Sequence, residues 1–256
     1  MFFSHTRTIL SINKGTICWT HGKVPKGELF GEICSKTWSE ENLREAFRDI
    51  SKRFSQKIRV VIGEEFAYDI SFGKEKSKDD ILLQIRGRIP EEVEKGWDFA
   101  ARKADVIQVM AVQKDFFSLL QKISAESEVN IESLETEAVA ICRQLPKNTD
   151  SPILFARHDA KILLGAAKNG VVLMAEVLED FPDAAKIKEF AAYIHKRFGE
   201  VAKLAFISEN NSELEDVFAK ADIAFEKVPL DPMIGTCKKK HLRGSDNEIL
   251  NIKVES

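Results

Sequence analysis

The chain has 256 residues, with 38 lysines and arginines against 41 aspartates and glutamates, a formal net charge of −3, and 44% hydrophobic residues. A globular chain of this length buries about three quarters of its surface, so its core needs no metal or disulfide for stability. The balanced charge disfavours a dedicated nucleic-acid binder. The composition excludes collagen, coiled coils, low-complexity chains and disulfide scaffolds. A mixed α/β protein of one large or two closely packed domains remains.

Before residue 150 the pattern alternates strands with helices. In chain order it predicts strands at 8–13, 16–20 and 29–37, a helix at 39–54, strands at 58–62 and 68–72, a helix at 77–87, strands at 97–102 and 106–112, a helix from 115, a strand at 129–134 and a short helix at 136–144. Ser39 is a good N-cap for the first helix. The run 58–62 is apolar throughout, which is typical of a strand buried on both faces.

A stretch rich in Pro, Asn, Asp and Ser at 146–152 predicts a boundary between two parts of the chain. After it the pattern of the first part returns, with strands at 153–156, 161–167 and 171–177, a helix at 184–198, a strand at 203–208, a helix at 212–220 and a strand at 223–228. Asn169-Gly170 predicts a type I′ hairpin turn. From Pro229 onward we expect a tail.

Both parts begin with three strands and continue with helix and strand units, which is the pattern of the actin-like ATPase fold. We therefore expect an α/β protein with duplicated, ribonuclease-H-like halves. The first half spans 1–148 and carries a small inserted subdomain at about 73–112. The second half spans 149–256 and includes the basic C-terminal tail.

Several segments carry a resemblance to a known family: ILSINKGTICWTHGK, KIRVVIGEEFAYDISF, ILLQIRGRIPEEVEKGWDFAARKADVIQVMAVQKDFFSLLQKI, VNIESLETEAVAICRQL and LRGSDNEILNI. With them the chain resembles PilM, the actin-like cytoplasmic protein of type IV pilus assembly, and more distantly the cytoplasmic part of GspL in type II secretion. PilM proteins insert a helical clamp subdomain in the second half. Here only residues 178–183 stand at that place, so the resemblance implies that the clamp subdomain is missing.

The same resemblance identifies the nucleotide positions. Actin-like ATPases use two D-x-G hairpins, whose glycines let backbone N–H groups approach the phosphates, and a Gly-Gly segment under the adenosine. The aligned residues are Asn13 and Gly15 in the first hairpin, Phe155 and Arg157 in the second, and Glu209 and Asn210 in the adenosine segment. Since Asn13 and Phe155 lack a carboxylate and Arg157 is bulky, we expect a pseudo-ATPase with no catalytic residue, no metal and no cofactor. The alternative is an ATP-binding switch or ATPase with unconventional phosphate contacts from Arg157 and Lys161.

The inserted subdomain contains Ile89, Pro90, Trp97 and Phe99 among many charged residues. One interpretation is that these side chains belong to the core. The other, implied by the resemblance, is that they border a groove for the N-terminal cytosolic peptide of a PilN-like bitopic membrane protein, bound in an extended form. A homodimer stays open, and no nucleic-acid partner is expected.

One basic cluster stands near the C-terminus and consists of Lys238, Lys239, Lys240 and Arg243. It is either a solvated tail or a weak contact with anionic lipid, where each basic residue near the surface contributes about 1 kcal/mol.

Four scattered cysteines without a C-x-x-C pair disfavour zinc and suit a reducing compartment. The first residues show no apolar h-region followed by a small-residue cleavage site, and the sequence has no run of 18 apolar residues, so we expect neither a secretory signal nor a membrane span. Together with the resemblance, these features predict a cytoplasmic protein peripheral to the inner membrane. Its expected role is a non-catalytic scaffold of a type IV pilus or type II secretion-like assembly platform.

Overall fold

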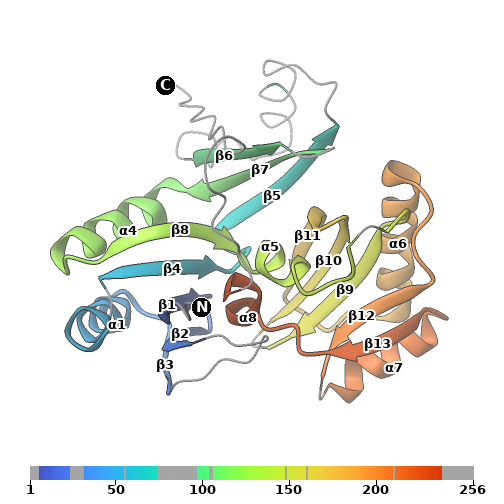
Figure 1. The fold of residues 1–256 in the computed structure, drawn as a ribbon. Coiled ribbons are helices and arrows are strands. Elements are labelled where there is room, and N and C mark those ends of the chain that lie inside the picture. The colour runs from blue at the N-terminus through green and yellow to red at the C-terminus, as the bar shows by residue number, and fades with distance from the viewer. Residues whose placement is uncertain are drawn as a thin grey trace, which may run out of the picture.

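The computed structural model describes residues 6–23, 32–54, 56–73, 83, 97–103, 106–147, 149–159, 161–209 and 211–237. These residues form two lobes, each built on a five-stranded sheet, and a separate three-stranded sheet that lies at the top in the view of Figure 1.

The sheet of the first lobe has the strand order β3-β2-β1-β4-β8. Its strands are β1 (Thr6–Ile12), β2 (Thr16–Lys23), β3 (Ile33–Thr37), β4 (Lys57–Ile62) and β8 (Asn130–Thr136). β1, β2 and β3 form an antiparallel meander, whereas β4 and β8 extend the sheet in parallel from β1.

The sheet of the second lobe repeats this arrangement with the order β11-β10-β9-β12-β13. Its strands are β9 (Ile153–His158), β10 (Ile162–Lys168), β11 (Val171–Leu178), β12 (Leu204–Ser208) and β13 (Ala224–Val228). Again an antiparallel meander is followed by two parallel strands. The duplicated architecture expected from the sequence is therefore confirmed. The boundaries of the two halves and of the insertion stay predictions.

Amphipathic helices cover the outer face of each lobe. α1 (Glu40–Arg53) and α4 (Lys114–Glu126) pack on the first sheet, and α6 (Ala184–Phe198) and α7 (Ser212–Lys220) pack on the second. Ser39 caps α1 as predicted, since its side chain accepts a hydrogen bond from the Asn42 N–H. The inner face of α1 buries Phe47 and Ile50 completely, and each such side chain contributes about 1.5–3 kcal/mol of transfer free energy.

Two short helices lie side by side between the lobes, α5 (Glu137–Cys142) and α8 (Pro232–Cys237) (Figure 1). They pack so closely that a Cβ added at Gly235 would lie 1.8 Å from the Ala140 carbonyl oxygen. The expectation of a tail after Pro229 is wrong for this stretch. Asp231 accepts a hydrogen bond from the Met233 N–H, and Pro232 occupies the first helical turn, where its missing N–H is not needed.

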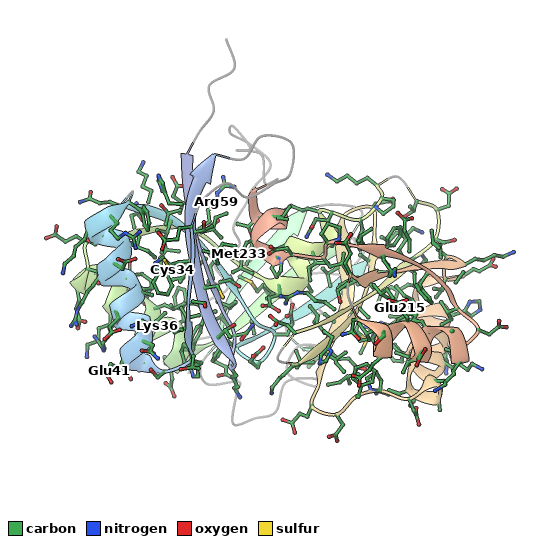
Figure 2. All side chains as sticks on the ribbon, turned by 90° about the horizontal axis from the view of Figure 1, so that it is seen from below. Cys34, Lys36, Glu41, Arg59, Glu215 and Met233 are labelled. Carbon is green, nitrogen blue, oxygen red and sulfur yellow. The ribbon has the colours of Figure 1, made fainter. Side chains whose placement is uncertain are left out.

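A buried polar network holds α8 against the first lobe. Arg59 on β4 donates to the Thr236 carbonyl at 2.9 Å, and the Thr236 hydroxyl donates to Glu135 on β8 at 2.6 Å. Arg143 binds the same carboxylate through both of its terminal nitrogens. Figure 2 shows Arg59 on the first lobe beside the helix that carries Met233. The chain after β13 therefore returns to the first lobe and connects the two halves a second time.

The third sheet has the order β5-β7-β6, with antiparallel strands β5 (Ala67–Gly73), β6 (Trp97–Lys103) and β7 (Val106–Gln113). The predicted strand pair at 97–102 and 106–112 is thereby confirmed. The helix predicted at 77–87 lies outside the described residues except for position 83. β5 runs next to β11, so this sheet adjoins the second lobe.

Candidate functional site

A pocket with an open volume of about 300 Å³, its mouth included, lies between the lobes. Residues from the β1–β2 hairpin, the β4–β5 loop, the start of α5 and the β9–β10 hairpin line it. The polar members are Asn13, Glu65, Glu137, Arg157, Asp159 and Lys161. Three carboxylates and two basic side chains thus meet in one small space.

The β1–β2 hairpin supplies three consecutive backbone N–H groups, and the chain itself occupies all of them. The Asn13 Oδ1 accepts from the N–H groups of Gly15 at 2.9 Å and Thr16 at 2.7 Å. The Lys14 N–H donates to the Glu65 carboxylate at 2.6 Å. A carboxylate of the protein therefore lies where an anionic ligand of this hairpin would bind.

The start of α5 is capped in the same way. The Ala138 N–H donates to the Glu64 carboxylate at 2.7 Å, and the Val139 N–H donates to the Thr136 hydroxyl at 3.4 Å. Glu64 and Glu65 follow the buried strand β4 after Gly63, and Glu64 is itself buried. Both carboxylates of the β4–β5 loop thus bind backbone donors beside the pocket.

The second hairpin does not lie where the sequence placed it. β9 continues to His158 and β10 begins at Ile162, so Phe155 lies inside the strand. Its ring is fully buried over Gly165, where an added Cβ would lie 2.1 Å from the Phe155 Cζ. Asp159 is the first residue after the strand and corresponds to Asn13 of the first lobe. The assignment of Phe155 and Arg157 to the turn is therefore wrong, because β9 extends two residues beyond the predicted strand end at 156.

Arg157 lines the pocket from the end of β9 and binds carboxylates of two other segments. Its guanidinium donates to the Glu137 carboxylate at 3.3 Å and to the Asp159 carboxylate at 3.0 Å. The Asn13 side-chain amide donates to the other Glu137 oxygen at 3.4 Å. Glu137 consequently links the first hairpin to the second lobe. Burial raises the pKa of Glu137, and the opposing effects of Arg157 and Asn13 are smaller.

The predicted adenosine segment follows β12, and its described residues form hydrogen bonds within the second lobe. The Glu209 N–H donates to the Val228 carbonyl at 3.2 Å. Asn211 caps α7 through the Leu214 N–H, and its amide donates to the His158 Nδ1 at 2.6 Å. Glu209 is not among the residues lining the pocket, and position 210 lies outside the described residues.

Other predicted site residues fall where the structure says little. Ile89, Pro90 and the basic cluster at 238–240 and 243 lie outside the described residues. Trp97 and Phe99 belong to β6, but their side chains are not described. The groove and the membrane contact accordingly stay predictions. Among the described residues, no group of three His, Cys, Asp or Glu side chains could hold a metal ion.

Sequence reasoning missed Glu64, Glu65, Glu137 and Asp159. Two signals were present: a Gly-Glu-Glu sequence at the carboxyl end of a buried strand, and an acidic residue directly after the N-cap Thr136. Neither signal says which backbone donors the carboxylates reach, because the partners stand 51 to 74 positions away in the chain.

Comparison with known proteins identifies the fold. No protein-family model matches the sequence, and no curated protein matches it. Among solved structures, a Bacteroides thetaiotaomicron protein with an actin-like ATPase fold and unknown function aligns with a TM-score of 0.63 and 10% identity, over 94% of this chain and 100% of that one. The PilM–PilN type IV pilus biogenesis complex gives a TM-score of 0.63 and 10% identity, over 89% of each chain.

The cytoplasmic domain of EpsL, an inner-membrane component of the type II secretion system of Vibrio cholerae, aligns with a TM-score of 0.55 and 10% identity over 95% of this chain and 100% of that one. The actin-like fold and the structural resemblance to PilM and the EpsL domain are therefore confirmed. In the part of the chain that the structure describes, no helix is long and apolar enough to cross a bilayer.

Proposed function

We propose that this protein is a non-catalytic scaffold of an inner-membrane assembly platform, of the kind that serves type IV pili or type II secretion. The observation that carries the proposal is the occupation of the first hairpin by the chain's own acceptors. Asn13 and Glu65 bind the three N–H groups that a phosphate would need. A ligand would have to displace Glu65 to reach the Lys14 N–H, and Asn13 to reach the N–H groups of Gly15 and Thr16.

Electrostatics supports the same conclusion. Glu65, Glu137 and Asp159 converge on the pocket, whereas Arg157 already pairs with two of these carboxylates. At an effective dielectric constant near 20, two like charges 4 Å apart repel by about 4 kcal/mol, so a triphosphate would enter an unfavourable field. Lys161 also stands in the turn at the place that corresponds to Gly15, where a glycine would let phosphate approach the backbone closely. These residues do not fit a bound nucleotide.

The proposed partner is a short cytosolic peptide of a PilN-like, single-span membrane protein. Support comes from the structural similarity to PilM in its complex with PilN. It also comes from the three-stranded sheet, in which β6 pairs with β7 alone among the described strands. A free strand edge can bind an extended peptide through backbone hydrogen bonds, with side-chain pockets that supply specificity.

Co-purification tests this half of the proposal. The tagged full chain, isolated from detergent-solubilised membranes of its host, should retain a single-span membrane protein with a short cytosolic N-terminal segment. A synthetic peptide of that segment should release the partner at about micromolar concentration. A scrambled peptide of the same composition is the control. Equal release by both peptides, or capture of soluble proteins alone, would count against the proposal.

The alternative is an ATP-dependent switch that uses Arg157 and Lys161 for phosphate. The presence of both side chains in the pocket favours it. Against it stands the engagement of Arg157 with Glu137 and Asp159, because phosphate binding would leave these two carboxylates without their cation. Calorimetric titration with Mg·ATP separates the two functions, because only the switch should bind it.

A further inference from the structure

Glu137 occupies a bridging position at the centre of the molecule. It begins α5, whose apolar residues Ala138 and Ile141 pack in a core cluster with Phe155 and Phe206 of the second lobe. The Glu137 carboxylate accepts from the first hairpin on one side and from Arg157 of the second lobe on the other. Its side chain is only 8% exposed.

Several acidic side chains lie near Glu137. From the β4–β5 loop Glu64 and Glu65 lie beside it, and Asp159 lies beside it from the second hairpin. Lys161 stands at the rim of the pocket, one third exposed, with its nitrogen 3.9 Å from Glu179. Of the cationic groups described here, only Arg157 forms an ion pair with Glu137.

We propose that Arg157 is an electrostatic lock between the lobes, which holds the cleft closed by neutralising Glu137 and whose loss lets the cleft open. The physical reason is the hydration of a carboxylate. A buried charge without its partner is strongly destabilising, while the same charge in water is not. Without the guanidinium, separating the lobes and admitting water to Glu137 lowers the free energy of the folded chain. This role does not depend on any partner protein.

The lock can be tested with three variants. R157M retains an apolar side chain of similar reach without its charge, E137Q removes the charge on the other side, and R157M/E137Q removes both. Spin labels on unnatural amino acids at Glu41 of α1 and Glu213 of α7 report the distance between the lobes, because these helices lie at opposite ends of the molecule (Figure 2). X-ray scattering supplies the radius of gyration.

At neutral pH we expect R157M to have an altered label-to-label distance distribution and a larger radius of gyration. E137Q and R157M/E137Q should match the wild type, since a neutral amide needs no counter-ion. K161M is the matched control and should also match the wild type, because it removes a rim cation that does not pair with Glu137. If R157M/E137Q regains the closed conformation that R157M has lost, the effect is electrostatic and not a general packing defect.

Acidification provides a second readout. Protonation removes the charge of Glu137, so R157M should close as the pH falls, whereas R157M/E137Q should stay closed throughout. If R157M alone does not fold, recovery of a folded, closed R157M/E137Q would still support the lock. An unchanged distance distribution in R157M, or a double variant as open as R157M, would overturn it.

Discussion

Asn13, Glu64 and Glu65 share one property: each accepts hydrogen bonds from backbone N–H groups beside the cleft. Hydrogen bonds to charged acceptors, such as the carboxylates of Glu64 and Glu65, contribute about 1.5–3 kcal/mol, roughly twice the value of bonds to a neutral acceptor such as the Asn13 amide. The hairpin and the start of α5 are therefore stabilised by side chains of the protein and need no external anion. Both segments therefore keep their local geometry through side chains of the chain itself.

A single substitution at the first hairpin should not create a nucleotide site. In N13D the carboxylate expected by the resemblance is restored, but Glu65 still occupies the Lys14 N–H and the new charge lies beside Glu137. Calorimetric titration of N13D with Mg·ATP should therefore give no heat of binding. Micromolar affinity in this variant would contradict the assignment of Glu65 as an internal ligand.

Glu137 should make stability depend on pH with a defined sign. Burial raises its pKa in the folded chain, so the folded chain binds the proton more readily than the unfolded chain. Stability should then fall as the pH rises from the ordinary glutamate pKa of about 4.3 through the raised value.

E137Q has no carboxyl group that titrates at this position. As the pH rises over that range, the free energy of unfolding of the wild type should therefore fall relative to that of E137Q. Urea unfolding of both proteins, in steps from about pH 4.5 to 8, measures the difference. A constant difference across all steps would show that Glu137 titrates normally.

At the scale of elements, α5 and α8 pack closely together between the two parts of the chain. The substitution G235A should destabilise by about 1–3 kcal/mol, because the added Cβ would overlap the Ala140 carbonyl oxygen. The control is the opposite substitution, A192G, on the exposed side of α6. It changes helix propensity alone and should destabilise by about 1 kcal/mol. Alanine is thus favoured at 192 and disfavoured at 235. Urea unfolding measures both, and a stabilised G235A would refute the close packing.

Local signals predicted most elements correctly. Asn169 and Gly170 both have positive φ, 53° and 77°, as the type I′ turn requires. The helices at 184–198 and 212–220 have the predicted bounds. α8 was missed because six residues are too few for a periodic pattern, although Asp231-Pro232 is a good helix start.

The candidate site was harder to predict for a physical reason. The end of β9 is polar, at Arg157 and His158, so the predicted strand ended two residues too early, and the hairpin motif was assigned to 155–157, four residues too early. The contacts of Glu65 and Glu137 join segments that only the folded sheet brings together. The sequence therefore left open which carboxylates of the chain line the pocket.

For the whole molecule, the fold limits the function without deciding it. Two lobes, two connections through α5 and α8, and a third sheet form an architecture that resembles PilM and the EpsL domain. One fold can host many activities, so the argument for a scaffold depends on the pocket and not on the similarity alone.

The proposed contact with a membrane surface depends on the basic cluster at 238–240 and 243, outside the described residues. K238E/K239E/K240E should reduce co-sedimentation with vesicles of anionic lipid, since each basic residue near such a surface contributes about 1 kcal/mol. Vesicles of neutral lipid are the control. Equal sedimentation of variant and wild type would remove the membrane contact and leave a solvated tail.

The central claim is that the cleft is occupied by the protein's own side chains and does not bind nucleotide. Calorimetric titration of the purified full chain with Mg·ATP, up to millimolar concentration, tests it most directly. The account predicts no binding for the wild type. A dissociation constant in the micromolar range would contradict it, because the ligand would then have displaced Glu65 from the Lys14 N–H and Arg157 from Glu137, and the ATP-dependent switch would be the better explanation.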